Sequence, residues 1–289
     1  MTASWKDYEV EILELLKAEF PDSQISENQF REGRYSKTQR QIDILIEGTI
    51  AGHRFSVVID AKYYARSVDV KGVEEFIGMV NDIGAHKGLI ITKEGYSDAA
   101  LERAFNDPLD IELDILNFKQ LEPHQGPVAI PWSGKFGALF KAPFGWIVDG
   151  TQHEKPSPPA HLYQRGLTMD EAVGRGEFMY VQFWDRTKDG DDLSKVLEQQ
   201  KSDLEEHDPC ASIEYLQTVT RNDAKTCLRL AKLPKYGNVE EYTGFVEFKD
   251  FVLFIVLLTP RRLAKKNIRK LESVMLDAMP IEVRDETRH

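Results

Sequence analysis

Hydrophobic and polar positions follow a mixed pattern in the first 121 residues. Segments with an apolar residue every three or four positions alternate with short, nearly continuous apolar runs. The first pattern is typical of helices and the second of buried strands. Together they predict helices at 5–20, 70–83 and 97–105, and strands at 41–47, 54–60, 88–92 and 111–118. The order of these elements predicts a compact α/β domain.

Beyond Leu121 the pattern changes, and most strand-like runs follow one another directly. Prolines at 123, 127 and 131 mark the change and indicate a linker. Strands are predicted at 177–184, 211–220, 226–233, 242–248 and 251–259, and helices at 192–206 and 262–279. Consecutive strands favour an antiparallel sheet in an α+β domain. The predicted organisation is a first domain at 1–122, a linker at 123–136, a second domain at 137–282 and a tail at 283–289.

Composition narrows the setting in which the 289-residue chain works. The longest apolar run, 251–258, is far shorter than the roughly 20 residues that span a bilayer. The first 20 residues are rich in glutamate and lack the apolar segment of a signal peptide. The two cysteines, Cys210 and Cys227, form no CxxC pair. We expect a cytoplasmic protein with no membrane partner.

Charge argues against coating of nucleic acid by bulk attraction. The chain has 37 basic and 48 acidic residues, a net charge of −11, and residues 1–125 hold 14 and 23 of them, a net charge of −9. Any site for a polyanion must therefore be a local patch. Arg31, Arg34, Lys37 and Arg40 form such a patch in the segment before residue 41. We interpret it as a phosphate-contacting loop; a solvated loop is the alternative.

Acidic residues interrupt two of the most apolar predicted strands. Asp43 lies within the strand 41–47, and a carboxylate there must be paired, hydrogen-bonded or bound to metal. Asp60 and Lys62 are two positions apart, so both side chains leave the same face of the next strand. A short reversal between the strands would bring Asp43 beside Asp60. Two acids and a lysine then converge, which suits Mg²⁺ and the polarisation of a phosphoryl group.

A third acid comes from the first helix. On a helical wheel, Glu9 falls inside the apolar arc, which includes Trp5, Ile12 and Leu16. We expect Glu9 to face the acidic cluster, directly or through water. The alternative is a boundary glutamate that pairs with a lysine.

These residues resemble the PD-(D/E)XK nuclease superfamily, and more closely the catalytic domain of Mrr-type restriction endonucleases. The resemblance covers about residues 4–121. It rests on an ordered set of segments: 40–44, 59–63, 70–80, 88–92 and 95–100. The superfamily is named for a motif with a proline directly before the first aspartate, and in this chain Ile42 occupies that position, before Asp43. The resemblance implies a restriction-endonuclease-like α/β fold, a mixed sheet flanked by helices.

The resemblance also implies Mg²⁺-dependent hydrolysis of DNA, with Mn²⁺ as a substitute, in restriction or phage defence. Asp43 and Asp60 would hold the metal, with the Ala61 carbonyl as a further ligand and Glu9 as the helical acid. Lys62 would position or activate the attacking water. A homodimer would suit cleavage of both strands by one active site per chain.

Other interpretations of the same residues stay open. Asp43, Asp60 and Lys62 would form a structural ion-pair network if the domain had no catalytic role. The fold would serve a DNA-binding or adaptor protein if catalysis had been lost. A third alternative is a nuclease restrained by its own second domain.

The second domain offers weaker signals. Helix 262–279 carries basic residues at four-residue spacing, Arg261, Lys265 and Arg269 in one row and Arg262, Lys266 and Lys270 in another. Such a ridge could face solvent, bind DNA, or dock on the first domain or on a protein partner. Residues 142–147 resemble the start of PsbP-like domains, which implies an interaction or sensor module.

Overall fold

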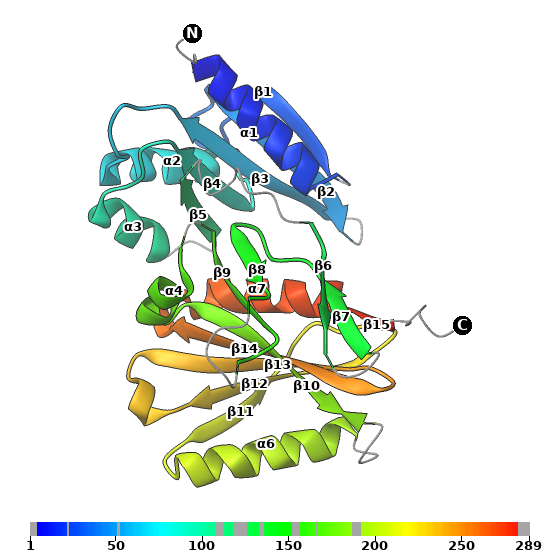
Figure 1. Cartoon of the computed structure of the whole chain (residues 1–289). Helices are drawn as coiled ribbons and strands as arrows, with labels where there is room; N and C mark the ends of the chain where they lie inside the picture. Colours follow the sequence, from blue (N-terminus) through cyan, green and yellow to red (C-terminus); the bar gives the residue numbers. More distant parts are fainter. Residues whose placement is uncertain are drawn as a thin grey trace. The chain divides into compact units, whose positions relative to one another are not determined.

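A computed structural model describes residues 5–21, 23–50, 53–107, 112–117, 126–132, 136–151, 157–165, 167–186 and 192–282. The chain forms two compact units, Met1–His124 and Gln125–His289. Each unit has its own sheet and its own hydrophobic core (Figure 1).

The first unit is built on a five-stranded mixed sheet in the order β1-β2-β3-β4-β5. Pairing is antiparallel from β1 to β3 and parallel from β3 to β5. The strands are β1 (Gln24–Glu32), β2 (Gln39–Ile50), β3 (His53–Lys62), β4 (Lys87–Thr92) and β5 (Glu112–Asn117). The helices are α1 (Trp5–Glu19), α2 (Val70–Ile83) and α3 (Asp98–Phe105). This is the restriction-endonuclease-like arrangement expected from the sequence.

Helix α2 forms where its sequence provides both ends. Asp69 caps the first turn by accepting a hydrogen bond from the Gly72 N–H at 3.0 Å. Gly84 ends the helix at φ 69°, a conformation that glycine adopts without strain. Between these ends the apolar face packs on the sheet and buries Val73, Phe76, Ile77 and Val80 with residues of β2, β3 and β4. Each such side chain contributes about 1.5–3 kcal/mol on burial.

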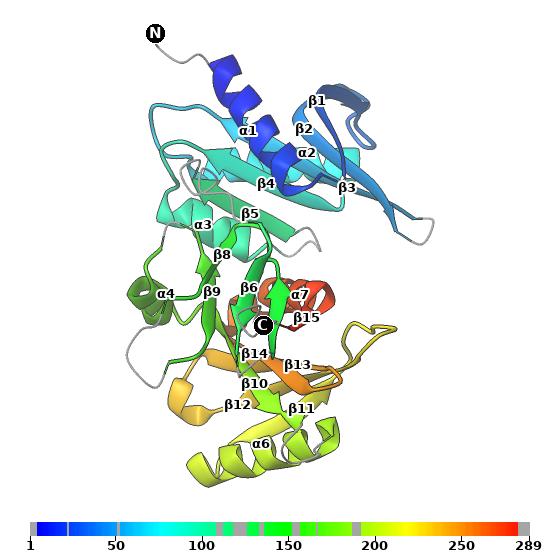
Figure 2. The same cartoon turned by 45° about the vertical axis from the view of Figure 1, so that its right-hand side comes forward.

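Helix α1 lies against β1 and β3 (Figure 2). Ile12 and Leu16 are fully buried, as the helical wheel predicts. Trp5 is 51% exposed, so its expected place in the buried arc is wrong. A wheel gives the direction of a side chain but not whether the sheet extends beneath the first turn.

The second unit contains an antiparallel seven-stranded sheet in the order β11-β12-β13-β14-β10-β9-β8, and a three-stranded sheet in the order β15-β7-β6. The larger sheet comprises β8 (Trp146–Asp149), β9 (Ala160–Gln164), β10 (Phe178–Asp185), β11 (Ser212–Leu216), β12 (Lys225–Lys232), β13 (Val239–Glu247) and β14 (Phe251–Pro260). The smaller sheet comprises β6 (Val128–Pro131), β7 (Phe136–Phe140) and β15 (Met279–Glu282). The antiparallel sheet was expected, but β6 places a strand inside the predicted linker at 123–136.

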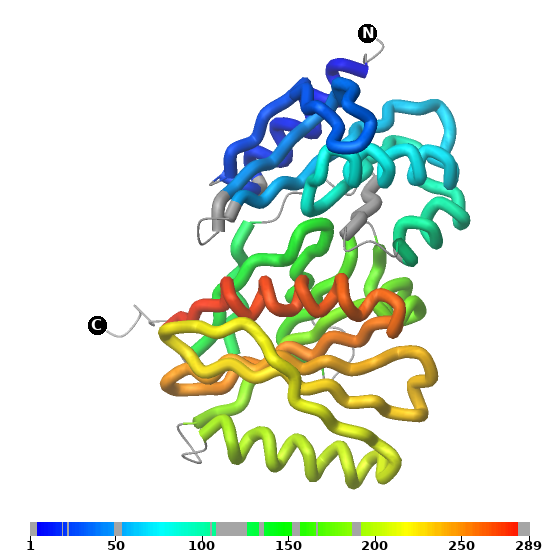
Figure 3. The backbone as a smooth tube through the Cα atoms, turned by 180° about the vertical axis from the view of Figure 1, so that it is seen from behind, coloured from blue at the N-terminus to red at the C-terminus, as the bar shows by residue number. Residues whose placement is uncertain are grey.

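Two helices cover opposite faces of the larger sheet (Figures 1 and 3). On one face, α7 (Ala264–Asp277), which follows the short helix η3 (Arg261–Leu263), packs into the main apolar core. Gly244 allows close packing there, because a Cβ atom at this position would lie 2.4 Å from the sulfur of Met275. On the other face, α6 (Leu193–His207) buries Leu193 and Val196 against β13 and β14. The remaining described helices are α4 (Met169–Arg175) and η2 (Pro234–Tyr236).

Candidate active site

The acidic residues of β2 and β3 lie where the two strands stop pairing. The antiparallel register ends at Ile44 and Ile59, and Asp43 and Asp60 are the next positions on each strand. The Asp43 Oδ2 atom accepts a hydrogen bond from the Ala61 N–H at 2.9 Å. Asp43 is therefore held against the end of β3, beside Asp60, as the spacing of the two segments leads one to expect.

Lys62 joins the pair from the same strand as Asp60. Its Nζ atom lies 2.7 Å from Asp60 Oδ2, a short charge-assisted contact. The side chains of Lys62 and Asp60 are 25% and 13% exposed, respectively. The ammonium therefore retains access to solvent, while the carboxylate is largely enclosed.

The environment of Asp60 favours its neutral form. Burial is the largest cause, and the neighbouring carboxyl of Asp43 adds repulsion and a side-chain hydrogen bond. The ammonium of Lys62 acts in the opposite direction, but the balance raises the pKa of Asp60 to about 7. A divalent cation bound between the two carboxyls would remove the repulsion that helps to raise the pKa of Asp60.

Lys62 stays protonated at neutral pH. Burial lowers the pKa of its ammonium, but the carboxylates of Asp60 and Asp43 outweigh burial, and the net pKa lies above the ordinary lysine value. A lysine in this state can orient a water molecule and stabilise negative charge. It is poorly suited to accept a proton.

Glu9 reaches the electrostatic field of the pair from α1. Burial raises the pKa of Glu9, and the nearby charge of Asp43 raises it further. Glu9 is half-buried. Within the described residues, however, no group of three or more acidic, histidine or cysteine side chains lies close enough to hold a metal ion. Glu9 thus influences the acidic pair without joining it as a third close carboxylate.

The chemistry of the donors fits Mg²⁺. This ion is commonly bound through one or two carboxylates, with water and substrate phosphate filling the other positions. Asp43 and Asp60 supply two carboxylates, and their mutual repulsion is the electrostatic feature that a cation would remove. The carbonyl of Ala61, at the end of β3, stays a predicted further ligand.

Thr92 is a neighbour of the site that the sequence did not single out. It is the parallel register partner of Lys62, so the two side chains leave the same face of the sheet. Thr92 is fully buried, and its Oγ1 atom has no hydrogen-bond partner within the described part of the chain. The sequence signal was a hydroxyl residue at the end of the apolar segment 88–92.

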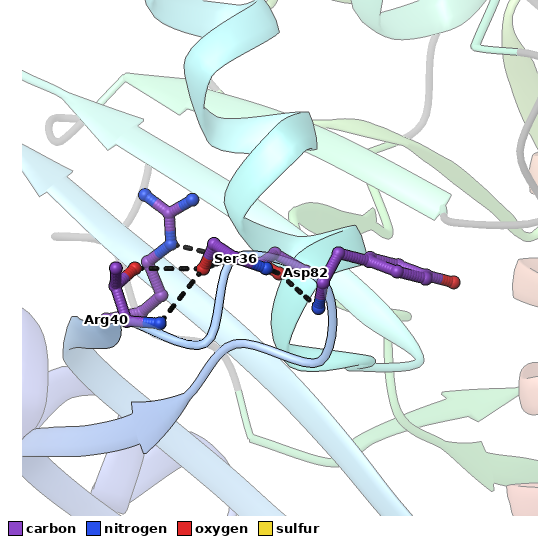
Figure 4. A network of polar contacts seen from close by, with 5 residues as sticks. Ser36, Arg40 and Asp82 are labelled. Atoms are coloured by element: carbon purple, nitrogen blue, oxygen red, sulfur yellow. Dashed lines mark hydrogen bonds and ion pairs between the residues drawn. The ribbon is translucent and has the colours of Figure 1, made fainter.

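The basic loop predicted to contact phosphate is anchored to the end of α2 (Figure 4). Asp82 accepts hydrogen bonds from the N–H groups of Tyr35 and Ser36, both at 3.0 Å, and from the Ser36 hydroxyl at 2.6 Å. It also receives the Arg40 Nε–H at 2.8 Å. These donors, led by Ser36, hold the pKa of the Asp82 carboxyl well below its usual range. Arg40 is thus fixed to the end of α2 through its Nε–H while its side chain stays 40% exposed, and the residues before it are held in place.

Two other basic residues of the patch line a cleft of about 620 Å³. Arg31 pairs with Glu47 at 3.2 Å and is 45% exposed, and Arg34 donates to the Gly84 carbonyl at 3.3 Å. Arg54 and His86 line the same cleft and were not predicted from the sequence. The fourth predicted residue, Lys37, occupies the loop with φ 56°. Arg31 and Arg34 of the basic segment and Arg54 of β3 therefore converge on one cleft, called the arginine cleft below.

The first unit is thus a mixed α/β sheet with two acids and a lysine at the point where its strands separate, the arrangement of a restriction-endonuclease-like nuclease fold. A family model described as restriction endonuclease, Mrr_cat, matches residues 2–121. The first unit is therefore similar to this family, and the resemblance seen in the sequence is confirmed. The match supports a nuclease of restriction type.

Several solved structures are similar to parts of the chain. AspBHI, described as a DNA modification-dependent restriction endonuclease, shows 18% identity over 37% of this chain and 27% of its own, with a TM-score of 0.28. The protein AF1548 shows 15% identity over 40% of this chain and 59% of its own, with a TM-score of 0.33. PsbP from Synechocystis sp. PCC 6803 shows 12% identity over 54% of this chain and 98% of its own, with a TM-score of 0.35. No curated protein matches the chain.

The basic ridge expected on the last helix is only partly a surface feature. Lys270 is buried, and its ammonium donates to the Phe144 carbonyl at 3.3 Å. Arg261 is exposed and lies 3.8 Å from Glu240. One of the two predicted basic rows therefore ends inside the second unit. Across the described residues, no helix is long and apolar enough to span a membrane.

Proposed function

We propose that the protein is a Mg²⁺-dependent DNA endonuclease whose active site is formed by Asp43, Asp60 and Lys62. The observation that carries the proposal is the crowded carboxyl pair with a charged lysine 2.7 Å from one of its members. Such a pair destabilises the fold unless a cation is bound. Groups whose pKa is strongly shifted in this way are typical of functional sites. The family of the first unit supports hydrolysis of DNA.

The residues would divide the work between them. Asp43 and Asp60 would hold the cation, with the Ala61 carbonyl as a further ligand. When bound, the cation supplies Lewis-acid polarisation of the phosphate and a lowered pKa for its water. Lys62 would orient the attacking water and stabilise the negative charge that develops on the phosphate. Glu9 would tune the acidic pair from α1.

DNA would be held by the loop before β2 and by the arginine cleft. Arg31, Arg34 and Lys37 are proposed to contact phosphates, whereas Arg40 would act through its bond to Asp82. The second unit is proposed as an interaction or sensor module. Restriction or phage defence in the cytoplasm is the biological role that a nuclease of this type would serve.

The decisive experiment is cleavage of plasmid and phage DNA by the purified chain with Mg²⁺, with Mn²⁺ or with EDTA. We expect cutting with either cation and none with EDTA. The Lys62→Ala variant should lose cutting while it still binds DNA, because the phosphate contacts lie elsewhere.

A matched control is Lys71→Ala, which removes an exposed lysine from α2 and leaves the acidic pair untouched. Its cleavage rate should equal that of the wild type. Equal cutting by Lys62→Ala and wild type would contradict the site assignment. Binding without cutting under every condition, by a correctly folded wild-type protein, would instead favour a DNA-binding or adaptor protein on the same fold.

A further inference from the structure

A second cleft lies in the second unit, between the C-terminal half of α6 and the face of the seven-stranded sheet. Its volume is about 410 Å³, within the range of sites for small molecules. Tyr180, Arg229 and Phe254 line it from the sheet, and Gln200 lines it from the helix. Lys235 and Tyr236, from η2, also line it. The cleft is thus bounded by three separate segments and has both charged and aromatic walls.

Arg229 lies in this cleft with much of its hydrogen-bonding capacity unused. It is 1% exposed, which is rare for an arginine. Its Nη2 atom donates to Glu241 Oε1 and to Thr243 Oγ1, both at 2.9 Å. Its Nε and Nη1 atoms have no hydrogen-bond partner among the described residues.

Arg229 has more N–H donors than the described residues provide acceptors for. A guanidinium has five N–H donors, and the two on Nη2 are used. The ring of Phe245 lies 5.5 Å from the guanidinium carbon and offers partial electrostatic compensation. Three N–H groups remain that require an oxygen acceptor, since buried donors without one are costly.

The surroundings of Arg229 indicate what that acceptor is. Glu241 balances the charge of Arg229, and the lining also holds a second cation, Lys235, and a second anion, Asp203 of α6. Lys235 also contacts the ring of Tyr236, with its ammonium 5.1 Å from the ring centre. Tyr180, Tyr236 and Phe254 provide flat apolar surface. An oxygen anion on a planar, apolar body satisfies both the donors of Arg229 that have no partner among the described residues and the aromatic walls.

We propose that this cleft binds a small aromatic carboxylic acid, with the carboxylate on Arg229 and Lys235 and the ring between α6 and the sheet. The site is separate from the acidic pair of the first unit and does not depend on the nuclease assignment. It gives the second unit a ligand class where the sequence implied only a sensor or interaction module.

The test uses the full-length chain and benzoate as the probe, with binding followed by ligand-detected NMR titration. Benzoate should bind saturably in the millimolar range or tighter. Benzamide has the same shape without the charge, and it should bind at least about tenfold more weakly. Arg229→Lys should weaken benzoate binding by a similar factor, because lysine retains the charge but lacks the guanidinium fork.

Because Arg229 is buried, its replacement could unfold the second unit, and a second variant keeps the test decisive. Gln200→Trp fills the cleft from α6 and should abolish benzoate binding. Glu198→Trp adds the same side chain to an exposed position of the same helix and should bind as the wild type does. Failure of the folded wild type to bind benzoate would overturn the proposal. So would equal binding of benzamide, or unchanged binding by Gln200→Trp.

Discussion

Both units bury a charged cluster in a sheet, but the clusters are built on opposite principles. In the first unit two carboxyls, Asp43 and Asp60, crowd each other at the point where β2 and β3 separate. In the second unit Arg229 of β12 and Glu241 of β13 lie diagonally across the two paired strands and neutralise each other at 2.9 Å. The first cluster has an excess of negative charge, and the second has an excess of hydrogen-bond donors.

The difference shows what each cluster can bind. Like charges at strand ends are costly, and here Lys62 beside them keeps access to solvent, which suits a cation and a reaction. Opposite charges within a continuous sheet largely neutralise each other, which suits a structural role. Such a pair leaves only N–H groups without acceptors, and these can bind a ligand. The two clusters should therefore respond differently to the same chemical change, and the experiments below compare them.

The largest effect, on the rate of cleavage, is expected when one acid of each cluster is replaced by its amide. Asp60→Asn removes a proposed metal ligand and the partner of Lys62, so cleavage should fall by roughly 10²–10⁴-fold. Glu241→Gln keeps a hydrogen-bond acceptor for Arg229 and should leave cleavage unchanged. Rates on a single plasmid substrate, with circular dichroism to verify folding, measure both. A similar loss in the two variants would mean that cleavage depends on overall stability and not on the acidic pair.

Parts of this comparison were predictable from the sequence and parts were not. The strands of Asp43 and Asp60 are continuous apolar runs, so an acid in each is conspicuous, and the two-residue spacing to Lys62 fixes its face. Helix α2 was predicted at its observed bounds because its apolar period and both caps are local.

The remaining features depend on partners that are distant in the sequence. Strand β1 is mostly polar and exposed, and it forms because β2 offers it a ladder of backbone hydrogen bonds. The anchor of the basic loop, Asp82, is 46 residues from Ser36. Arg229 looks like any surface arginine in its strand, and only the three-dimensional fold shows that α6 and the sheet enclose it. Local patterns cannot reveal such long-range contacts.

The next effect is a pH dependence of stability that should be larger for the first cluster, because burial raises the pKa of Glu241 less than the pKa of Asp60 is raised. The pKa of Asp60 is about 7 in the folded protein and 3.8 ordinarily, so the folded state holds a proton between these values that the unfolded state has lost. Asp60 therefore stabilises the fold most below pH 4, and that stability is lost as pH rises through 7, by at most about 4 kcal/mol. Asp60→Asn should abolish this dependence. Thermal unfolding followed at several pH values measures the difference.

Mg²⁺ provides a check that is independent of cleavage. A bound cation favours the ionised carboxyl and lowers its pKa, so Mg²⁺ should raise the melting temperature of the wild type at pH 7 to 8. The rise should be smaller at pH 5 and absent in Asp60→Asn. Parallel melting curves with and without Mg²⁺, at every pH, would count against the acidic pair as a cation site.

A smaller effect is expected from breaking the pair in the second unit. Glu241→Ala leaves Arg229 buried without its counter-ion, and the unfolding free energy of this unit should fall by about 3 kcal/mol. Three of the four tryptophans lie in the second unit, so denaturation followed by fluorescence reports on it. The control is Glu214→Ala, which removes half of an exposed pair with Lys232 and should cost less than about 1 kcal/mol. Equal losses in the two variants would mean that Arg229 has other partners.

The smallest effect on stability is expected at Arg31, where binding and folding can be separated. The pair of Arg31 with Glu47 is solvent-exposed, so Arg31→Ala should change the unfolding free energy by less than about 1 kcal/mol. If Arg31 contacts a phosphate, the same variant should weaken DNA binding uniformly across sequences. It should also reduce the slope of log affinity against log salt by about 1, because one fewer counterion is released. Lys71→Ala, the exposed control on α2, should leave both affinity and slope unchanged. An unaltered slope in Arg31→Ala would leave Arg31 as a surface partner of Glu47, and the arginine cleft would then have to bind DNA through Arg34 and Arg54 alone.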